Sequence, residues 1–117
     1  MENSADGREF EEMINYNYVK KAAMILRAFD NPLRQKIFTY LAENYNTTVT
    51  EITLNFQVEQ SVISQHLAVL RRAKIISNLK NGKFVHYYIN KKRVTEIQNF
   101  VNSISTDTEL SKVIDLQ

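Results

Sequence analysis

The chain has 117 residues, of which 44% are hydrophobic and 24% are charged, a size and composition typical of one globular domain. It contains no cysteine, which excludes disulfide bonds, thiolate metal sites and thiol redox switches. Residues 1–12 lack the basic start and apolar run of a signal peptide, and no apolar stretch is long enough to span a membrane. We therefore expect a cytoplasmic protein that does not act at a membrane.

The formal net charge of +2 is distributed unevenly along the chain. Five acids against one arginine give residues 1–12 a charge of −4, and three acids against one lysine give residues 107–117 a charge of −2. Residues 13–106 therefore carry +8, which suits a polyanionic partner, although scattered solvated lysines explain the charge equally well. We predict a flexible acidic tail over residues 1–8 and a single domain over residues 9–117.

The first predicted helix covers residues 9–29, where apolar residues recur at helical spacing. We interpret Tyr16 and Tyr18 as packing residues of this helix. The stripe is broad enough to meet more than one neighbour. Its members are Phe10, Met13, Ile14, Tyr18, Ala22, Ile25, Leu26 and Phe29.

The second predicted helix begins after Asp30, because Asn31 can cap its amino terminus and Pro32 fits its first turn. It ends near Asn44. Its inward residues are Leu33, Ile37, Phe38 and Leu41.

A short helix over residues 49–55 follows, with Ile52 and Leu54 as its apolar contacts and Thr50 as its expected cap, although its first turn could start one or two residues earlier. Residues 56–59 form a tight connection to a helix over residues 60–73. One face of that helix is apolar, with Ile63, Leu67 and Leu70. The opposite face is small and uncharged, with Ser61, Ser64, Gln65 and Ala68.

The next segment predicts a β-hairpin. A strand starts at residues 75–76, and Asn81 with Gly82 is expected to supply both positive-φ positions of a two-residue turn. The return strand covers residues 84–89. A last helix over residues 91–105 has heptad-like apolar spacing, which favours a seam between two copies over a purely internal core contact. Its apolar residues are Val94, Ile97, Phe100, Val101 and Ile104.

Two short helices joined by a tight turn, the second with small polar side chains, indicate a helix-turn-helix. Serine, glutamine and histidine side chains can meet base edges, although a solvated helix face has the same composition. Cations at the end of this helix and on the hairpin suit phosphate contacts, which position a protein without reading sequence. The cations are Arg71, Arg72, Lys74, Lys80 and Lys83. His66, beside buried Leu67, is either a DNA contact or a partly buried structural histidine.

Four segments in this order resemble the winged-helix core of the ArsR/SmtB repressors: FDNPLRQKIFTYL, TVTEI, SVISQHLAVLRRAKII and NGKFVHYYIN. The resemblance covers a little over half of the chain. It implies a mainly α protein with a small β-hairpin, an α+β winged helix-turn-helix of order α-α-α-α-β-β-α, with its DNA-reading core over about 30–90. It also implies a homodimer through helices 9–29 and 91–105.

In function, the resemblance implies a repressor whose recognition helices enter the major grooves of a pseudo-palindromic double-stranded operator, nucleoid-associated when bound. Gln65 stands where many relatives have arginine. Residues implied at the bases are Gln60, Ser61, Ser64, Gln65 and His66, and the hairpin adds Lys80, Lys83 and His86 at the backbone. The implied dimer contacts are Phe10, Met13, Ile14, Val94, Ile97, Phe100, Val101 and Ile104.

The sequence departs from the family pattern at the positions where relatives bind a metal ion or a thiol-reactive signal. Thr48 and Thr50 replace the Cys-x-Cys pair of metal sensors, and the last helix has no histidine and only Glu96 as an acid. We therefore predict no metal, no cofactor and no thiol regulation, and no pattern points to a particular small-molecule effector. Glycine-rich phosphate loops, nucleophile motifs and paired carboxylates are lacking, so an enzyme is not expected. The alternative is a winged-helix protein-interaction module, against which the basic hairpin argues.

Overall fold

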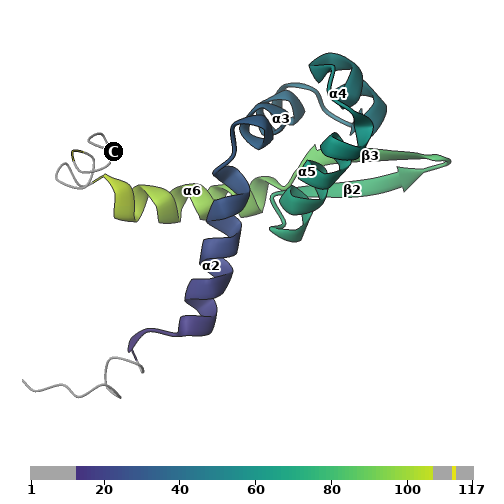
Figure 1. Cartoon of the computed structure of the whole chain (residues 1–117). Helices are drawn as coiled ribbons and strands as arrows, with labels where there is room; N and C mark the ends of the chain where they lie inside the picture. The colour runs from purple at the N-terminus through teal and green to yellow at the C-terminus, as the bar shows by residue number, and fades with distance from the viewer. Residues whose placement is uncertain (1–12, 107–111, 113–117) are drawn as a thin grey trace, which may run out of the picture.

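The computed structural model describes residues 13–106 and residue 112 (Figure 1). Its elements confirm the predicted α+β winged-helix order and add one short strand, β1. Phe10 and the predicted acidic tail lie outside the described residues. The elements are α2 (Tyr16–Phe29), α3 (Pro32–Glu43), β1 (Thr47–Thr48), α4 (Val49–Phe56), α5 (Gln60–Arg72), β2 (Ile76–Asn81), β3 (Phe84–Ile89) and α6 (Lys91–Ser105).

Helix α2 begins later than predicted. Ile14 and Asn15 are not helical, and the Asn15 side chain accepts hydrogen bonds from the backbone N–H groups of residues 17 and 18. A capping side chain of this kind starts a new helix, so the prediction of one continuous helix over 9–29 was wrong. Tyr16 and Tyr18 are exposed, which corrects their interpretation as packing residues.

Helix α3 starts as its sequence predicts. The Asn31 side chain accepts from the N–H of Arg34 at 2.9 Å, and Pro32 occupies the first turn. Ile37 and Leu41 are buried, and Phe38 packs edge-on against Phe29 of α2 with ring centroids 5.2 Å apart. The helix ends at Glu43, with Asn44 as its carboxyl-terminal cap.

Helix α4 is capped by Thr48 and not by Thr50: the Thr48 hydroxyl accepts from the N–H of Glu51. Leu54 is 72% exposed, so its predicted core contact was also wrong. The reason is helical periodicity, since residues 49, 52 and 56 share one face and residue 54 lies on the other side. Phe56, on the inward face of α4, packs against the core and against Tyr40.

The three strands form one antiparallel sheet in the order β1-β3-β2. Asn81 pairs with Phe84, so the two-residue loop is Gly82-Lys83 and not Asn81-Gly82 as predicted. Of these loop residues only Gly82 has a positive φ, 64°, which is the pattern of a turn with glycine at its first central position. The hairpin of β2 and β3, called the wing below, projects from the body of the molecule (Figure 1).

The buried core lies where α5 meets α3, α4 and the base of the sheet, while α2 and α6 extend away from this body (Figure 1). Its members are Ala28, Ile37, Leu41, Ile52, Ile63, Leu67, Leu70, Ala73, Ile75 and Ile76. None of the described helices is both long and apolar enough to cross a membrane.

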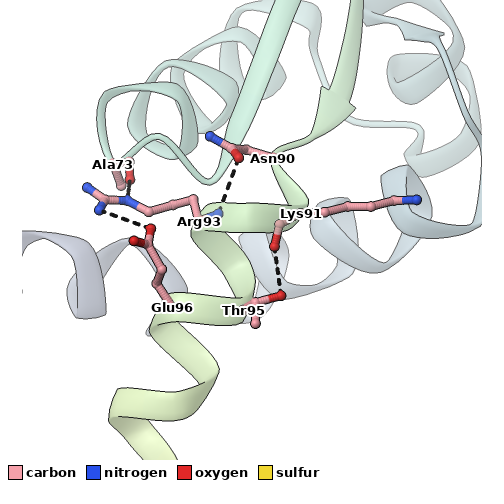
Figure 2. Close-up of polar contacts among 6 residues, drawn as sticks. All are labelled: Ala73, Asn90, Lys91, Arg93, Thr95 and Glu96. Carbon is pink, nitrogen blue, oxygen red and sulfur yellow. Dashed lines mark hydrogen bonds and ion pairs between the residues drawn. The ribbon is translucent and has the colours of Figure 1, made fainter.

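Helix α6 is attached to the body at its first turn (Figure 2). The Asn90 side chain caps it by accepting from the N–H of Arg93 at 3.2 Å. The Nε of Arg93 donates to the carbonyl oxygen of Ala73, 3.1 Å away at the end of α5, and its Nη1 lies 3.9 Å from Glu96. Val94 and Ile97 pack against the core, but no residue of α6 is fully buried.

Candidate nucleic-acid interface

Helices α4 and α5 are joined by the three residues Gln57, Val58 and Glu59. Gln57 adopts the left-handed conformation (φ 54°, ψ 39°), and its N–H donates to the Thr53 carbonyl at 2.9 Å. One left-handed residue at a helix end turns the chain sharply, so α5 leaves at an angle to α4. The two helices and their short turn form the predicted helix-turn-helix.

Helix α5 has two distinct faces. Ile63, Leu67 and Leu70 are buried against the core. The opposite face is exposed and uncharged and can offer hydrogen-bond donors and acceptors to a partner. Its exposed members are Gln60, Ser61, Ser64 and Gln65. Because the body is packed behind it, this row of polar side chains is presented to solvent on a fixed surface.

The end of α5 places three cations near the base of the wing. Arg71, Arg72 and Lys74 are exposed. Lys74 has φ 62°, its N–H donates to the Arg71 carbonyl, and the next N–H, of Ile75, donates to the Leu70 carbonyl at 3.0 Å. This paired arrangement is a Schellman motif with lysine where glycine is usual. Arg71 and Lys74 share a shallow hollow with Ser77, Asn78 and Tyr88 at the base of the wing and with Asn90, the cap of α6.

Lys80 and Lys83 lie at the far end of the wing, both exposed and flanking the turn. His86 does not lie with them. It pairs with Thr48 on one side and Leu79 on the other, and its Nδ1 is 3.1 Å from the carbonyl oxygen of Asn46. The structure therefore brings His86 to the middle of the sheet, beside β1, and leaves the two lysines at the tip.

His66 is half-buried at the rim of α5, and its Nδ1 lies 3.1 Å from Nη1 of Arg34 in α3. Burial of the ring, and then the charge of Arg34, lower the pKa of His66 below its ordinary value. This geometry supports the structural interpretation of His66. Sequence reasoning missed Arg34. The available signal was a cation in the first turn of a helix, where the helix dipole disfavours positive charge.

The predicted dimer contacts fall on α6 and before α2. Met13, Ile14, Phe100 and Ile104 are exposed large hydrophobic residues. Val94, Ile97 and Val101 are half-buried. An apolar hollow between α2 and α6 brings two of these side chains, Ile97 and Phe100, close to the apolar stripe of α2. It is lined by Ala22, Ile25, Leu26, Arg93, Glu96, Ile97 and Phe100.

The structure offers no ready metal site in the residues it describes, because no three His, Cys, Asp or Glu side chains gather there. Thr48, at the position of a family metal ligand, uses its hydroxyl to cap α4 and to contact the Glu51 carboxylate at 3.3 Å. Thr50 is exposed on the first turn of the same helix.

Comparison with known proteins gives consistent results. Residues 31–78 match the model of the arsR family of bacterial regulatory proteins. An uncharacterized HTH-type transcriptional regulator of Methanocaldococcus jannaschii is 39% identical over 85 residues, which cover 73% of this chain and 96% of that protein. The transcriptional repressor PagR of Bacillus anthracis is 30% identical over 94 residues, covering 80% and 94% of the two chains.

Solved structures agree with the sequence matches. The crystal structure of PagR superposes with a TM-score of 0.59, covering 75% of this chain and all of that one. The crystal structure of a possible transcriptional regulator for arsenical resistance is 26% identical and superposes with a TM-score of 0.67, covering 80% and 95%. The similarity therefore extends well beyond residues 31–78, into the outer helices.

Proposed function

Because the chain belongs to the arsR family of bacterial regulatory proteins, and is accordingly a DNA-binding transcription regulator and not an enzyme, we propose that it is a dimeric repressor of a pseudo-palindromic operator. The observation that carries the proposal is the polar, uncharged and exposed face of α5 in a helix-turn-helix, followed along the chain by exposed cations at the end of α5 and at the tip of the wing. A major groove admits one α-helix, and this face offers the groups that base edges can pair with.

Base reading is assigned to the exposed face of α5. Gln65 can donate to and accept from the N7 and N6 edge of adenine, while Ser61 and Ser64 can pair with several bases. Gln60 lies in the first turn, where a recognition helix is closest to the groove floor. His66 borders this face, but one nitrogen of its ring is engaged by Arg34, so we assign it no direct base contact, in contrast to the role that the family resemblance implies.

Backbone contacts are assigned to the exposed cations. Lys80 and Lys83 at the wing tip can reach phosphates beside the groove that α5 enters. The cations at the end of α5, with His86 in the sheet, complete the proposed set. These contacts supply affinity that falls with added salt, because each neutralised phosphate releases counterions. The cations at the helix end are Arg71, Arg72 and Lys74.

The dimer is proposed through the outer helices. Helix α6 carries an apolar stripe, yet a single copy buries none of its residues fully. Exposed apolar residues gathered on one face mark an association surface, and a second copy would cover the same faces of α2 and α6 symmetrically. Two copies would also place two recognition helices on one duplex, as a pseudo-palindrome requires.

Regulation by a metal or a thiol is not part of the proposal. The chain has no cysteine, and the threonine at one family metal position is engaged as a helix cap. Repression is favoured because PagR, similar over most of its length, is a transcriptional repressor. We propose that release from the operator does not require transition-metal binding.

The binding test uses fluorescence anisotropy with the full chain and duplexes selected from random sequence. We expect one pseudo-palindromic sequence to bind at least about 10³-fold more tightly than random duplex, and both affinities to fall steeply with salt. Gln65→Ala should change the preferred sequence. Lys80→Glu with Lys83→Glu should weaken all duplexes alike, and Lys36→Glu on α3 serves as the charge control. Failure to bind any duplex at low salt would refute the proposal in favour of a protein-interaction module.

The dimer test is sedimentation equilibrium. Phe100→Glu places a charge in the proposed seam and should convert a dimer to a monomer. Asn99→Glu adds the same charge at the neighbouring exposed position, outside the apolar stripe, and should leave the mass unchanged. A wild-type monomer at micromolar concentration, or equal effects of both variants, would contradict a seam at α6.

A further inference from the structure

One side chain, that of Arg34, joins three helices. Its Nε donates to the carbonyl oxygen of Ala28 at 2.7 Å and its Nη2 donates to that of Arg27 at 3.0 Å, both in the last turn of α2. Its remaining nitrogen, Nη1, lies 3.1 Å from Nδ1 of His66 in α5. Arg34 itself belongs to the first turn of α3 and is half-buried. The guanidinium of Arg34 therefore connects α3, to which it belongs, with both α2 and α5.

The chemistry of these contacts fixes the state of His66. A guanidinium has only donors, so Nδ1 of His66 must be the acceptor, and the proton of the neutral ring must reside on Nε2. A protonated imidazole would have no lone pair for Arg34 and would place two positive charges in contact. The lowered pKa of His66, caused first by burial and second by Arg34, keeps the ring in the neutral form that the hydrogen bond needs.

Within residues 13–106, no carboxylate forms a salt bridge with Arg34, and Arg34 is the only charged side chain in hydrogen-bond contact with His66. The positive charge is met by the last carbonyl groups of α2, which form the negative end of its helix dipole. The cost of placing a cation in the first turn of α3 is thereby offset. Arg34 can hold its position without an acidic partner.

His66 occupies a sensitive position on α5. It lies between exposed Gln65 and buried Leu67, at the boundary between the apolar and polar faces. The hydrophobic burial of Ile63, Leu67 and Leu70 is not itself directional, so it specifies the rotation of the helix about its axis less sharply than a hydrogen bond does. A directional hydrogen bond at the rim restricts this rotation, and therefore determines where the neighbouring polar side chains point.

We propose that Arg34 is a positioning residue for the DNA-reading helix. Arg34 holds the rotation of α5 about its axis through neutral His66, and this rotation sets the sequence selectivity of the protein. The inference rests on the proposed function of α5. The guanidinium of Arg34 is already hydrogen-bonded to carbonyl groups of α2, so we do not expect it to contact DNA phosphates. Loss of Arg34 should therefore lower the sequence selectivity of the protein without lowering its affinity for random duplex.

The first experiment does not use DNA. Nuclear magnetic resonance of ¹⁵N-labelled histidine in the free full-length protein should show His66 protonated on Nε2 only, with a pKa below 6.5. Arg34→Gln removes the neighbouring charge and should raise this pKa, whereas Lys36→Gln, an equal charge loss two residues away on the exposed side of α3, should not. Protonation of Nδ1 in the neutral ring of the wild type would overturn the inference.

The second experiment measures selectivity, defined as the ratio of Kd for random duplex to Kd for the selected duplex. Arg34→Lys keeps the charge but loses the fork, so selectivity should fall about tenfold, as expected for one charge-assisted hydrogen bond. Random-duplex affinity should change by less than about twofold. In the wild type, selectivity should also fall as the pH is lowered through the pKa of His66.

Variants of His66 test the same hydrogen bond from its other side, and they can be used if the Arg34 variants do not fold. His66→Asn places an amide oxygen near the position of Nδ1 and cannot titrate, so selectivity should persist and lose its dependence on pH. His66→Phe keeps the ring shape without an acceptor and should lose selectivity like Arg34→Lys. If His66→Asn lost selectivity at neutral pH as fully as His66→Phe, His66 would read DNA directly and the positioning role would be refuted.

The two proposals fail in different ways. A wild-type protein without preference for any duplex would refute the proposed function and, with it, the selectivity role of Arg34. A selective wild type together with equally selective Arg34→Lys and His66→Phe variants would refute the positioning role alone.

Discussion

Lys74 is predicted to stabilise DNA binding while destabilising the fold. It holds a left-handed conformation, φ 62°, at the end of α5. That conformation costs an L-residue about 1–2 kcal/mol, because Cβ crowds the carbonyl oxygen. Glycine avoids this cost, but the unfolded chain gains freedom at glycine worth about 0.5–1 kcal/mol. Taking the midpoints of the two ranges, Lys74→Gly should therefore increase the free energy of unfolding by about 0.7 kcal/mol.

This gain corresponds to an increase in Tm of about 2–5 °C for a domain of this size, measurable by circular dichroism. The same variant removes a proposed phosphate contact from each copy of the dimer, so DNA affinity should fall for every duplex and the salt slope should decrease by about 1.8, which is about 0.9 for each contact. Gln57→Gly is the matched control, because Gln57 is also left-handed but uncharged. It should raise Tm without changing the salt slope.

A Tm unchanged or lowered by Lys74→Gly would refute the strain argument, provided that the Schellman hydrogen bonds of Lys74 and Ile75 persist in hydrogen exchange. An unchanged salt slope would refute the phosphate contact and leave the strain argument intact. The two parts of the prediction can therefore fail independently.

Three further predictions concern the fold. Thr48→Ala should lower the free energy of unfolding by about 1 kcal/mol in urea titrations because it removes the cap of α4, whereas Thr50→Ala should change it by less than about 0.5 kcal/mol. Ile37→Ala should cost about 2–5 kcal/mol, since Ile37 is fully buried, while Leu54→Ala at the exposed position should be nearly neutral. The lowered pKa of His66 means that the unfolded chain binds more protons near pH 6.5, so stability should decrease as the pH falls from about 6.5 through the folded-state pKa. His66→Asn should remove this contribution to the pH dependence of the free energy of unfolding. If the pH dependence of His66→Asn equalled that of the wild type, the lowered pKa of His66 would be contradicted.

Local signals in the sequence were sufficient for most elements of the fold. The Asn31-Pro32 start of α3 was predicted correctly because its cap and proline act within one turn. The buried face of α5 was predicted correctly because three apolar residues at helical spacing leave one possible inward side. Four family segments in order then specified the winged helix that the structure confirms.

The errors arose where two local signals competed or where the decisive partner was distant. Asn15 and Thr48 are caps that an apolar pattern or a neighbouring threonine concealed. The turn was predicted one residue too early, because Asn81 pairs across the hairpin with Phe84. The general preference of Asn-Gly pairs for two-residue turns does not show this pairing. Arg34 was missed because its partner His66 is 32 residues away, and only tertiary structure brings them together.

Strand β1 has a consequence for how the molecule folds. Thr47 pairs with Tyr87 in β3, 40 positions along the chain, so the ladder closes a loop that contains α4, α5 and β2. Closing such a loop costs chain entropy that two short strands cannot offset alone. The ladder therefore couples the helix-turn-helix to the wing, and we expect the two to unfold together. A fragment that ends at residue 78, where the family match ends, would lack β3 and should remain unfolded.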